Sequence, residues 1–99
     1  MRKEHIYFVY ILASKRNGTL YIGVTNGLFA RTFQHKIKKN SNSFTAKYNV
    51  NKLVYFETFK YINDALTQEK ELKRFRRNEK IELIEKDNST WRDLFLDMI

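Results

Sequence analysis

The chain has 99 residues, enough for a single domain with one modest core, and no apolar run in it approaches the roughly 18 residues of a membrane span. With 42% hydrophobic residues, 15% aromatic residues and no cysteine, the composition excludes a disordered chain, disulfide bonds and thiolate metal sites. Lysine and arginine number 19 against 11 acidic residues. The formal charge of +8 favours nucleic acid as the partner, although anionic membranes and ribosomes attract cations equally well.

Two predicted strands open the chain as a hairpin. Residues 6–13 and 19–25 are rich in β-branched and aromatic side chains, and Asn17-Gly18 between them is a strong signal for a two-residue turn. With that turn, Tyr10 pairs with Thr25 across the hairpin.

Side-chain alternation along paired strands separates two faces of the hairpin. One face is aliphatic throughout, and the other carries Tyr10, Tyr21 and Gly23. In one interpretation the tyrosines are ordinary strand residues that pack a second small core. In the other they belong to a functional site, because a glycine inside a strand often marks close approach of a ligand or of another backbone.

Residues 27–39 are predicted to form a helix. Its apolar residues recur every four positions, at Phe29, Phe33 and Ile37, and make a stripe typical of an amphipathic helix. Cations crowd the end of this helix, where they suit the helix dipole. These cations are Lys36, Lys38 and Lys39.

The remaining predicted elements follow in chain order. They are a polar loop over 40–43, a strand over 52–60, a helix over 62–76, a helix from Asn78 to Lys86 and a short final helix. We expect Asn63 or Asp64 to cap the helix over 62–76, and Thr90 with Asp93 to form a capping box for the final helix. The order β-β-α-β-α-α with a short last helix predicts an α+β fold. We expect a three-stranded, mostly antiparallel sheet flanked by helices, in one domain over residues 1–99.

A carboxylate lies on the apolar side of the predicted helix over 62–76. Glu69 is three residues from both Leu66 and Leu72, which belong to the stripe expected to face inward. A buried carboxylate without a partner is very costly, so Glu69 needs a metal ion, Lys73 one turn on, or an arginine elsewhere in the fold. A helix ion pair with Lys73 remains the structural alternative to a metal site.

Arg31 and His35 lie four residues apart and stack on one face of the helix over 27–39, away from its phenylalanines. An arginine can clamp a phosphate with two parallel hydrogen bonds, and a histidine can transfer a proton near neutral pH. Charged helix faces are usually only solvated, so neither residue alone indicates a site. The sequence has no glycine-rich phosphate loop and no histidine-carboxylate spacing for zinc.

Taken in order, these residues resemble the GIY-YIG nuclease superfamily, and most closely its small stand-alone bacterial members. The first signature tripeptide is matched by Phe8-Val9-Tyr10 and the second by Tyr21-Ile22-Gly23, after a short hairpin. The arginine, histidine and metal-binding glutamate of the family are matched by Arg31, His35 and Glu69. The resemblance extends over nearly the whole chain.

The chain departs from the family pattern at a few positions. The first tripeptide lacks its opening glycine and central isoleucine, and Val24 stands where some relatives carry a basic residue. Phe29-Ala30 replaces a charged pair usual in near relatives, which indicates a contact surface. Some members use a late asparagine in the site, for which Asn78 and Asn88 are the candidates.

The resemblance implies an endonuclease that hydrolyses phosphodiester bonds, in DNA more than in RNA, in DNA repair or recombination. Glu69 would hold one Mg²⁺ or Mn²⁺, Tyr10 would be the general base and Tyr21 would polarise the attacking water. Arg31 would stabilise charge on the phosphate oxygens, and His35 would assist proton transfer or hold the phosphate. A free phenol has a pKa of about 10, so the base role requires tuning by the metal and by Arg31.

Flanking phosphates would be contacted by basic side chains, which makes binding salt-dependent. The candidates are Lys36, Lys38, Lys39, Lys47, Arg74, Arg76 and Arg77. The main alternative is a non-catalytic nucleic-acid-binding module that keeps the nuclease fold, and a third interpretation is a protein-interaction domain whose charge serves RNA or ribosomes. We expect a cytoplasmic location without a signal peptide, no membrane partner and recognition of shape over sequence; the oligomeric state stays open.

Overall fold

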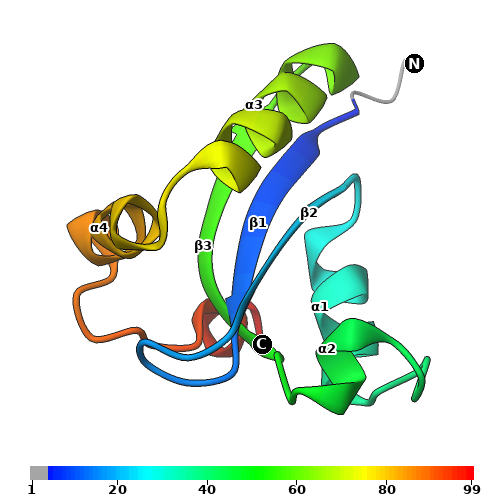
Figure 1. Cartoon of the computed structure of the whole chain (residues 1–99). Helices are drawn as coiled ribbons and strands as arrows, with labels where there is room; N and C mark the ends of the chain where they lie inside the picture. The colour runs from blue at the N-terminus through cyan, green and yellow to red at the C-terminus, as the bar shows by residue number, and fades with distance from the viewer. Residues whose placement is uncertain (1–4) are drawn as a thin grey trace.

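The computed structural model describes residues 5–99, which form a three-stranded antiparallel sheet in the order β2-β1-β3 with helices on both faces (Figure 1). The elements are β1 (Tyr7–Ala13), β2 (Leu20–Thr25), α1 (Leu28–Lys36), α2 (Phe44–Lys47), β3 (Lys52–Phe59), α3 (Ile62–Arg74), α4 (Arg77–Asp87) and a 3₁₀ helix, η1 (Leu94–Met98). The predicted α+β fold and its element order are confirmed. The one addition is α2, a single turn that begins where Ser43 accepts a hydrogen bond from the backbone N–H of Ala46.

The β1–β2 hairpin has a longer loop than predicted. Phe8 pairs with Thr25 and Tyr10 pairs with Gly23, so the predicted pairing of Tyr10 with Thr25 is wrong by two residues. Instead of a two-residue turn, the loop is closed by a hydrogen bond of 3.0 Å from Ser14 N–H to the carbonyl of Thr19. A shift of two residues keeps every side chain on its face of the sheet, so the predicted separation of the faces survives.

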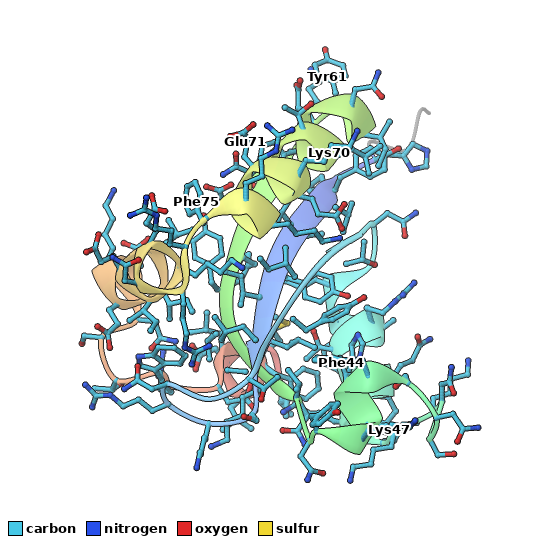
Figure 2. The ribbon with its side chains drawn as sticks, viewed as in Figure 1. Phe44, Lys47, Tyr61, Lys70, Glu71 and Phe75 are labelled. Carbon is cyan, nitrogen blue, oxygen red and sulfur yellow. The ribbon has the colours of Figure 1, made fainter. Side chains whose placement is uncertain are left out.

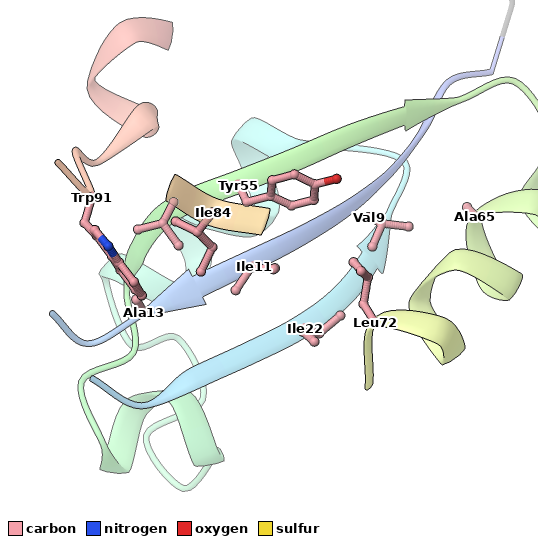
Figure 3. Packing of buried hydrophobic residues seen from close by; sticks show 10 residues of the cluster. Val9, Ile11, Ala13, Ile22, Tyr55, Ala65, Leu72, Ile84 and Trp91 are labelled. Carbon is pink, nitrogen blue, oxygen red and sulfur yellow. The ribbon is translucent and has the colours of Figure 1, made fainter. Parts of the chain in front are cut away.

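The aliphatic face of the hairpin faces the larger core. Val9, Ile11 and Ile22 pack there against Ala65 and Leu72 of α3 (Figure 3). The predicted inward stripe of α3 is narrower than expected, because Ile62 and Leu66 are each 39% exposed while Ala65 and Leu72 are fully buried. Ile84 of α4 and Trp91 complete this core.

The opposite face of the sheet carries a second, smaller core built around Tyr10, which is 1% exposed. Leu28 of α1 and Phe95 of η1 pack on it. The stripe of α1, however, points outward: Phe29 and Phe33 are each about half exposed, although the Phe29 ring stacks on Phe95 with centroids 5.0 Å apart. The side of α1 that packs inward is instead the one that carries its two buried residues, Leu28 and Thr32.

Two predicted caps differ from those observed. The N-cap of α3 is Tyr61, not Asn63 or Asp64, and the N-cap of α4 is Arg76, whose backbone N–H donates to Glu79 at 2.8 Å. The predicted start of this helix at Asn78 is therefore one residue later than the observed start at Arg77.

The predicted capping box of the last helix is wrong, because the N-cap is Asp93 and not Thr90. Asp93 also makes contacts beyond this cap. Its Oδ1 accepts from the backbone N–H of Phe95 and from that of Leu53, each at 3.1 Å, and its Oδ2 pairs with Lys36 of α1. The C-terminal segment is thereby tied to both β3 and α1. No helix within residues 5–99 is long and apolar enough to cross a bilayer.

Candidate active site

Tyr10 and Gly23 occupy one cross-strand position and depend on each other. The Tyr10 ring leans across its partner strand, so that a Cβ built on Gly23 would lie 2.6 Å from the phenol oxygen and 2.7 Å from Cζ. Real side chains do not tolerate contacts this short. Gly23 therefore supplies the space that the phenol of Tyr10 occupies, which agrees with the expectation that a mid-strand glycine marks close approach.

A chain of hydrogen bonds runs from this phenol into α2. The Tyr10 hydroxyl lies 3.4 Å from Nε2 of His35, and Nδ1 of His35 lies 2.8 Å from the hydroxyl of Thr45. Thr45 is 4% exposed, and its hydroxyl is 3.3 Å from that of Ser43. If Tyr10 donates to Nε2, then Nδ1–H donates to Thr45 and Thr45 donates to Ser43, and each member of the chain donates once.

The site opens to solvent through a pocket of about 430 Å³ between α1, α2 and β2. Tyr21, Arg31 and His35 line it, as do Lys38 and Lys39. The rings of Tyr21 and His35 are 5.7 Å apart, and those of Tyr10 and Tyr21 are 6.3 Å apart. Four of the five predicted catalytic side chains thus meet at one place: two phenols from the hairpin, with a guanidinium and an imidazole from α1.

Burial and neighbouring charges set the protonation of this group. Burial raises the pKa of the Tyr10 phenol, and the nearby Tyr21 and Glu69 act in the same direction, whereas Arg31 lowers it. Burial, followed by the Arg31 charge, lowers the pKa of His35 below its usual value of 6.5. Near pH 7 the folded protein therefore holds a neutral phenol against a neutral imidazole. Tyr10 is a poor base on its own, and the positive charge of Arg31 is what favours its ionised form.

Glu69 approaches the site from α3 and acts on the Tyr10 phenol through its charge, although it does not line the pocket. Its side chain is 19% exposed, and a carboxylate oxygen lies 3.4 Å from Nζ of Lys73. The helix ion pair considered from the sequence is therefore present. Within residues 5–99 no three His, Cys, Asp or Glu side chains cluster as metal ligands. A single carboxylate still suits Mg²⁺, which keeps several waters and takes one or two carboxylates together with substrate oxygens.

The basic side chains predicted to contact phosphates fall into two groups. Lys38 and Lys39 line the pocket, and Lys47 is exposed on α2 beside it (Figure 2). Lys36 is instead only 23% exposed and occupied by Asp93, so it stabilises the fold.

The three arginines of this set lie away from the pocket, where α3 gives way to α4. Arg77 donates to the carbonyls of Asn17 and Gly18, at 2.5 and 2.6 Å, and so ties α4 to the hairpin loop. Arg74 pairs loosely with Glu71 at 3.8 Å, and Arg76 is exposed.

Reasoning from the sequence missed Thr45 and Ser43. The available signal was the serine at position 43, three residues before Ala46 and after a polar loop, which is the pattern of a helix N-cap. Of the two candidate asparagines, Asn88 is buried and holds the carbonyls of Val54 and Arg92, so its amide serves the fold, while Asn78 is exposed on α4.

Comparisons with known proteins identify the family of this chain. The family model for the GIY-YIG catalytic domain matches residues 6–82. A UPF0213 protein of Clostridium perfringens is 40% identical over 81 residues, which covers 78% of this chain and 81% of that protein, and one of Staphylococcus haemolyticus is 35% identical over 79 residues, covering 80% and 94%. The solution structure of a UPF0213 protein from Bacillus halodurans superposes with a TM-score of 0.55 at 25% identity, covering 89% of this chain and 92% of that one. The chain therefore belongs to the GIY-YIG family.

Proposed function

We propose that the protein is a metal-dependent endonuclease that hydrolyses phosphodiester bonds, with DNA as the favoured substrate and DNA repair or recombination as the setting. One observation carries the proposal: Tyr21, Arg31 and His35 line one basic pocket, and the buried phenol of Tyr10 lies 3.4 Å from the imidazole of His35. The charge of Glu69 acts on the same phenol. Nucleases need their catalytic groups around one reacting phosphate, and this arrangement supplies them.

The protein's own side chains would activate water as a unit. Tyr21 orients the water, and Tyr10 takes its proton while passing its own phenolic proton to Nε2 of His35. Thr45 holds the imidazole so that Nε2 faces the phenol. The raised pKa of Tyr10 makes the imidazole partner necessary, because a buried phenol would otherwise keep its proton.

Arg31 has a separate task at the phosphate. It is exposed at the pocket wall, where its guanidinium can form two parallel hydrogen bonds with phosphate oxygens and stabilise their developing charge. Glu69 would hold one Mg²⁺ or Mn²⁺, which would polarise a phosphate oxygen and stabilise the leaving oxygen. For this, Glu69 must exchange its pairing with Lys73 for the metal.

Cleavage of labelled DNA tests the proposal. Blunt duplex, single-stranded and branched DNA are incubated with Mg²⁺, with and without EDTA, using wild-type protein, Glu69→Gln and Glu71→Gln. Glu71 is a matched control, since it lies on α3 with an exposed side chain that pairs with an arginine. We expect Glu69→Gln alone to abolish cleavage while DNA binding remains. Metal-dependent cleavage that persists in Glu69→Gln would refute the assigned metal site.

The pairing of Glu69 with Lys73 favours a second candidate, a nucleic-acid-binding module without catalysis. This candidate predicts tight, salt-dependent DNA binding but no metal-dependent cleavage of any of the three substrates. A flat dependence of affinity on salt would count against both candidates, since both require contacts with phosphates.

A further inference from the structure

The single turn of α2 has two faces with different roles. Thr45 and Ala46 are buried on its inner face, where Thr45 contacts His35. Its outer face presents Phe44 and Lys47 to solvent (Figure 2). Tyr48, the residue that follows the helix, is also exposed. One short element therefore supports the catalytic imidazole on one side and forms a surface on the other.

The outer face of α2 is an exposed aromatic pair. Phe44 is 48% exposed and Tyr48 is 56% exposed, and their ring centroids lie 4.9 Å apart. Phe44 lies at the edge of the pocket in the chain, because its neighbours Ser43 and Thr45 both line it, although the two rings themselves do not. Exposed aromatic area next to a polar pocket is costly in water and is typical of a binding surface.

The stretch of sequence that contains this pair carries positive charges and no negative ones. No aspartate or glutamate occurs from His5 to Phe56, so α1, α2 and the first two strands carry only cationic or neutral side chains. Lys47 lies between the two aromatic residues in the chain, and Lys38 and Lys39 line the adjoining pocket. Aromatic faces combined with lysines are the pattern of a surface for single-stranded nucleic acid, in which bases stack and phosphates pair with cations.

We propose that Phe44 and Tyr48 form a stacking platform for unpaired bases beside the scissile phosphate. The preferred substrate is then nucleic acid with a single-stranded stretch next to the cut, such as a flap, a fork or an overhang. An intact duplex hides the faces of its bases and cannot use the platform. This inference rests on the proposed function, because the platform is placed relative to the phosphate in the pocket.

Binding of three fluorescent DNA ligands tests the platform: a single strand, a blunt duplex, and a duplex with a single-stranded flap. Anisotropy titrations compare wild type, the double variant Phe44→Ala/Tyr48→Ala, and Phe33→Ala. Phe33 is a matched control, since it is an equally exposed phenylalanine, at 47%, that lies on α1 outside the platform. We expect the double variant to bind the single strand and the flap about tenfold more weakly, with blunt-duplex affinity unchanged and no effect of Phe33→Ala.

A further variant protects the test against misfolding. The single variant Phe44→Trp keeps an aromatic face, so it should bind the single strand and the flap as wild type does. Loss of binding caused by unfolding would instead appear in thermal melts of the double variant. Equal weakening for all three ligands, or weakening for none, would overturn the platform.

Failure of the platform and failure of the proposed function give different results. Mg²⁺-dependent cleavage that is lost in Glu69→Gln, together with no selective effect at Phe44 and Tyr48, refutes the platform alone. Selective loss of single-strand binding without cleavage of any substrate refutes the enzyme and supports the platform in a binding module. Absence of both binding and cleavage overturns both.

Discussion

Substitution of Gly23 by alanine tests how closely the hairpin positions the phenol of Tyr10. The new methyl group would meet the Tyr10 hydroxyl at 2.6 Å, so the phenol must retreat by about 0.8 Å to reach ordinary van der Waals contact. Tyr10 is 1% exposed and has little room to move. Overpacking of this kind lowers the free energy of unfolding by about 1–3 kcal/mol.

Activity should suffer more than stability in Gly23→Ala. The Tyr10 hydroxyl is already 3.4 Å from His35, and a further shift would break that hydrogen bond. Misplacement of a catalytic group by about 1 Å can reduce the rate roughly 100-fold. Urea denaturation gives the unfolding free energy, and single-turnover cleavage with Mg²⁺ gives the rate of the chemical step.

Gly27→Ala is the matched control for this experiment. Gly27 precedes α1 with φ of −140°, and a Cβ there would meet nothing within 4 Å. Its substitution should cost less than about 1 kcal/mol and leave cleavage near the wild-type rate. If Gly23→Ala matched Gly27→Ala in both stability and rate, the argument that Gly23 makes room for Tyr10 would be refuted.

Three substitutions test the groups around the site and the C-terminal tie, and the pH dependence of stability gives one prediction more. Thr45→Val removes the hydroxyl beside Nδ1 of His35 and should slow single-turnover cleavage about tenfold, whereas Thr45→Ser should stay near wild type. Arg31→Gln removes a charge that lowers the pKa of His35, so an NMR titration should show that pKa rising toward 6.5. In the wild type the unfolded chain binds this proton more readily than the folded one, so the unfolding free energy should fall as the pH drops below about 6.5. Asp93→Ala leaves two backbone N–H groups and an ammonium without their acceptor and should lower the unfolding free energy by about 2–4 kcal/mol, against less than about 1 kcal/mol for the exposed Asp97→Ala.

Each of these predictions has a clear contrary result. Equal cleavage rates in Thr45→Val and Thr45→Ser would show that the hydroxyl does not orient His35. An unchanged pKa of His35 in Arg31→Gln would show that the guanidinium does not influence the imidazole. Comparable melting temperatures for Asp93→Ala and Asp97→Ala would show that the C-terminal tie contributes little.

The sheet and the faces of its hairpin were predictable because alternation along a strand depends on local sequence alone. Its register was not. A two-residue type I′ turn needs a positive φ at both Asn17 and Gly18, and only Asn17 has one, with φ of 57°, so a longer loop forms. The exposure of Phe29 and Phe33 was also beyond local reasoning. A four-residue period fixes which residues share a helix face, but the packing of α1 decides which face meets the sheet.

The candidate site was likewise predictable from the sequence only in part. The resemblance placed Tyr10, Tyr21, Arg31 and His35 in order along the chain. The structure brings the last three to one pocket and buries Tyr10 beside His35. Thr45 reaches His35 only because α2 folds back on α1, a contact that no period in the sequence encodes. The neutral state of His35 likewise depends on burial and on Arg31, both of which arise in the folded protein.

The tie made by Asp93 has a consequence for engineering the protein. Ile99 is 84% exposed, so residues appended to the end of the chain would extend into solvent without disturbing η1. A chain shortened to end before Asp93 would instead release Lys36 at the end of α1, the helix that carries both Arg31 and His35. Affinity tags and fusion partners are therefore compatible with the C-terminus. Deletion of as few as the last seven residues would instead loosen α1, which lies about 60 positions earlier in the chain.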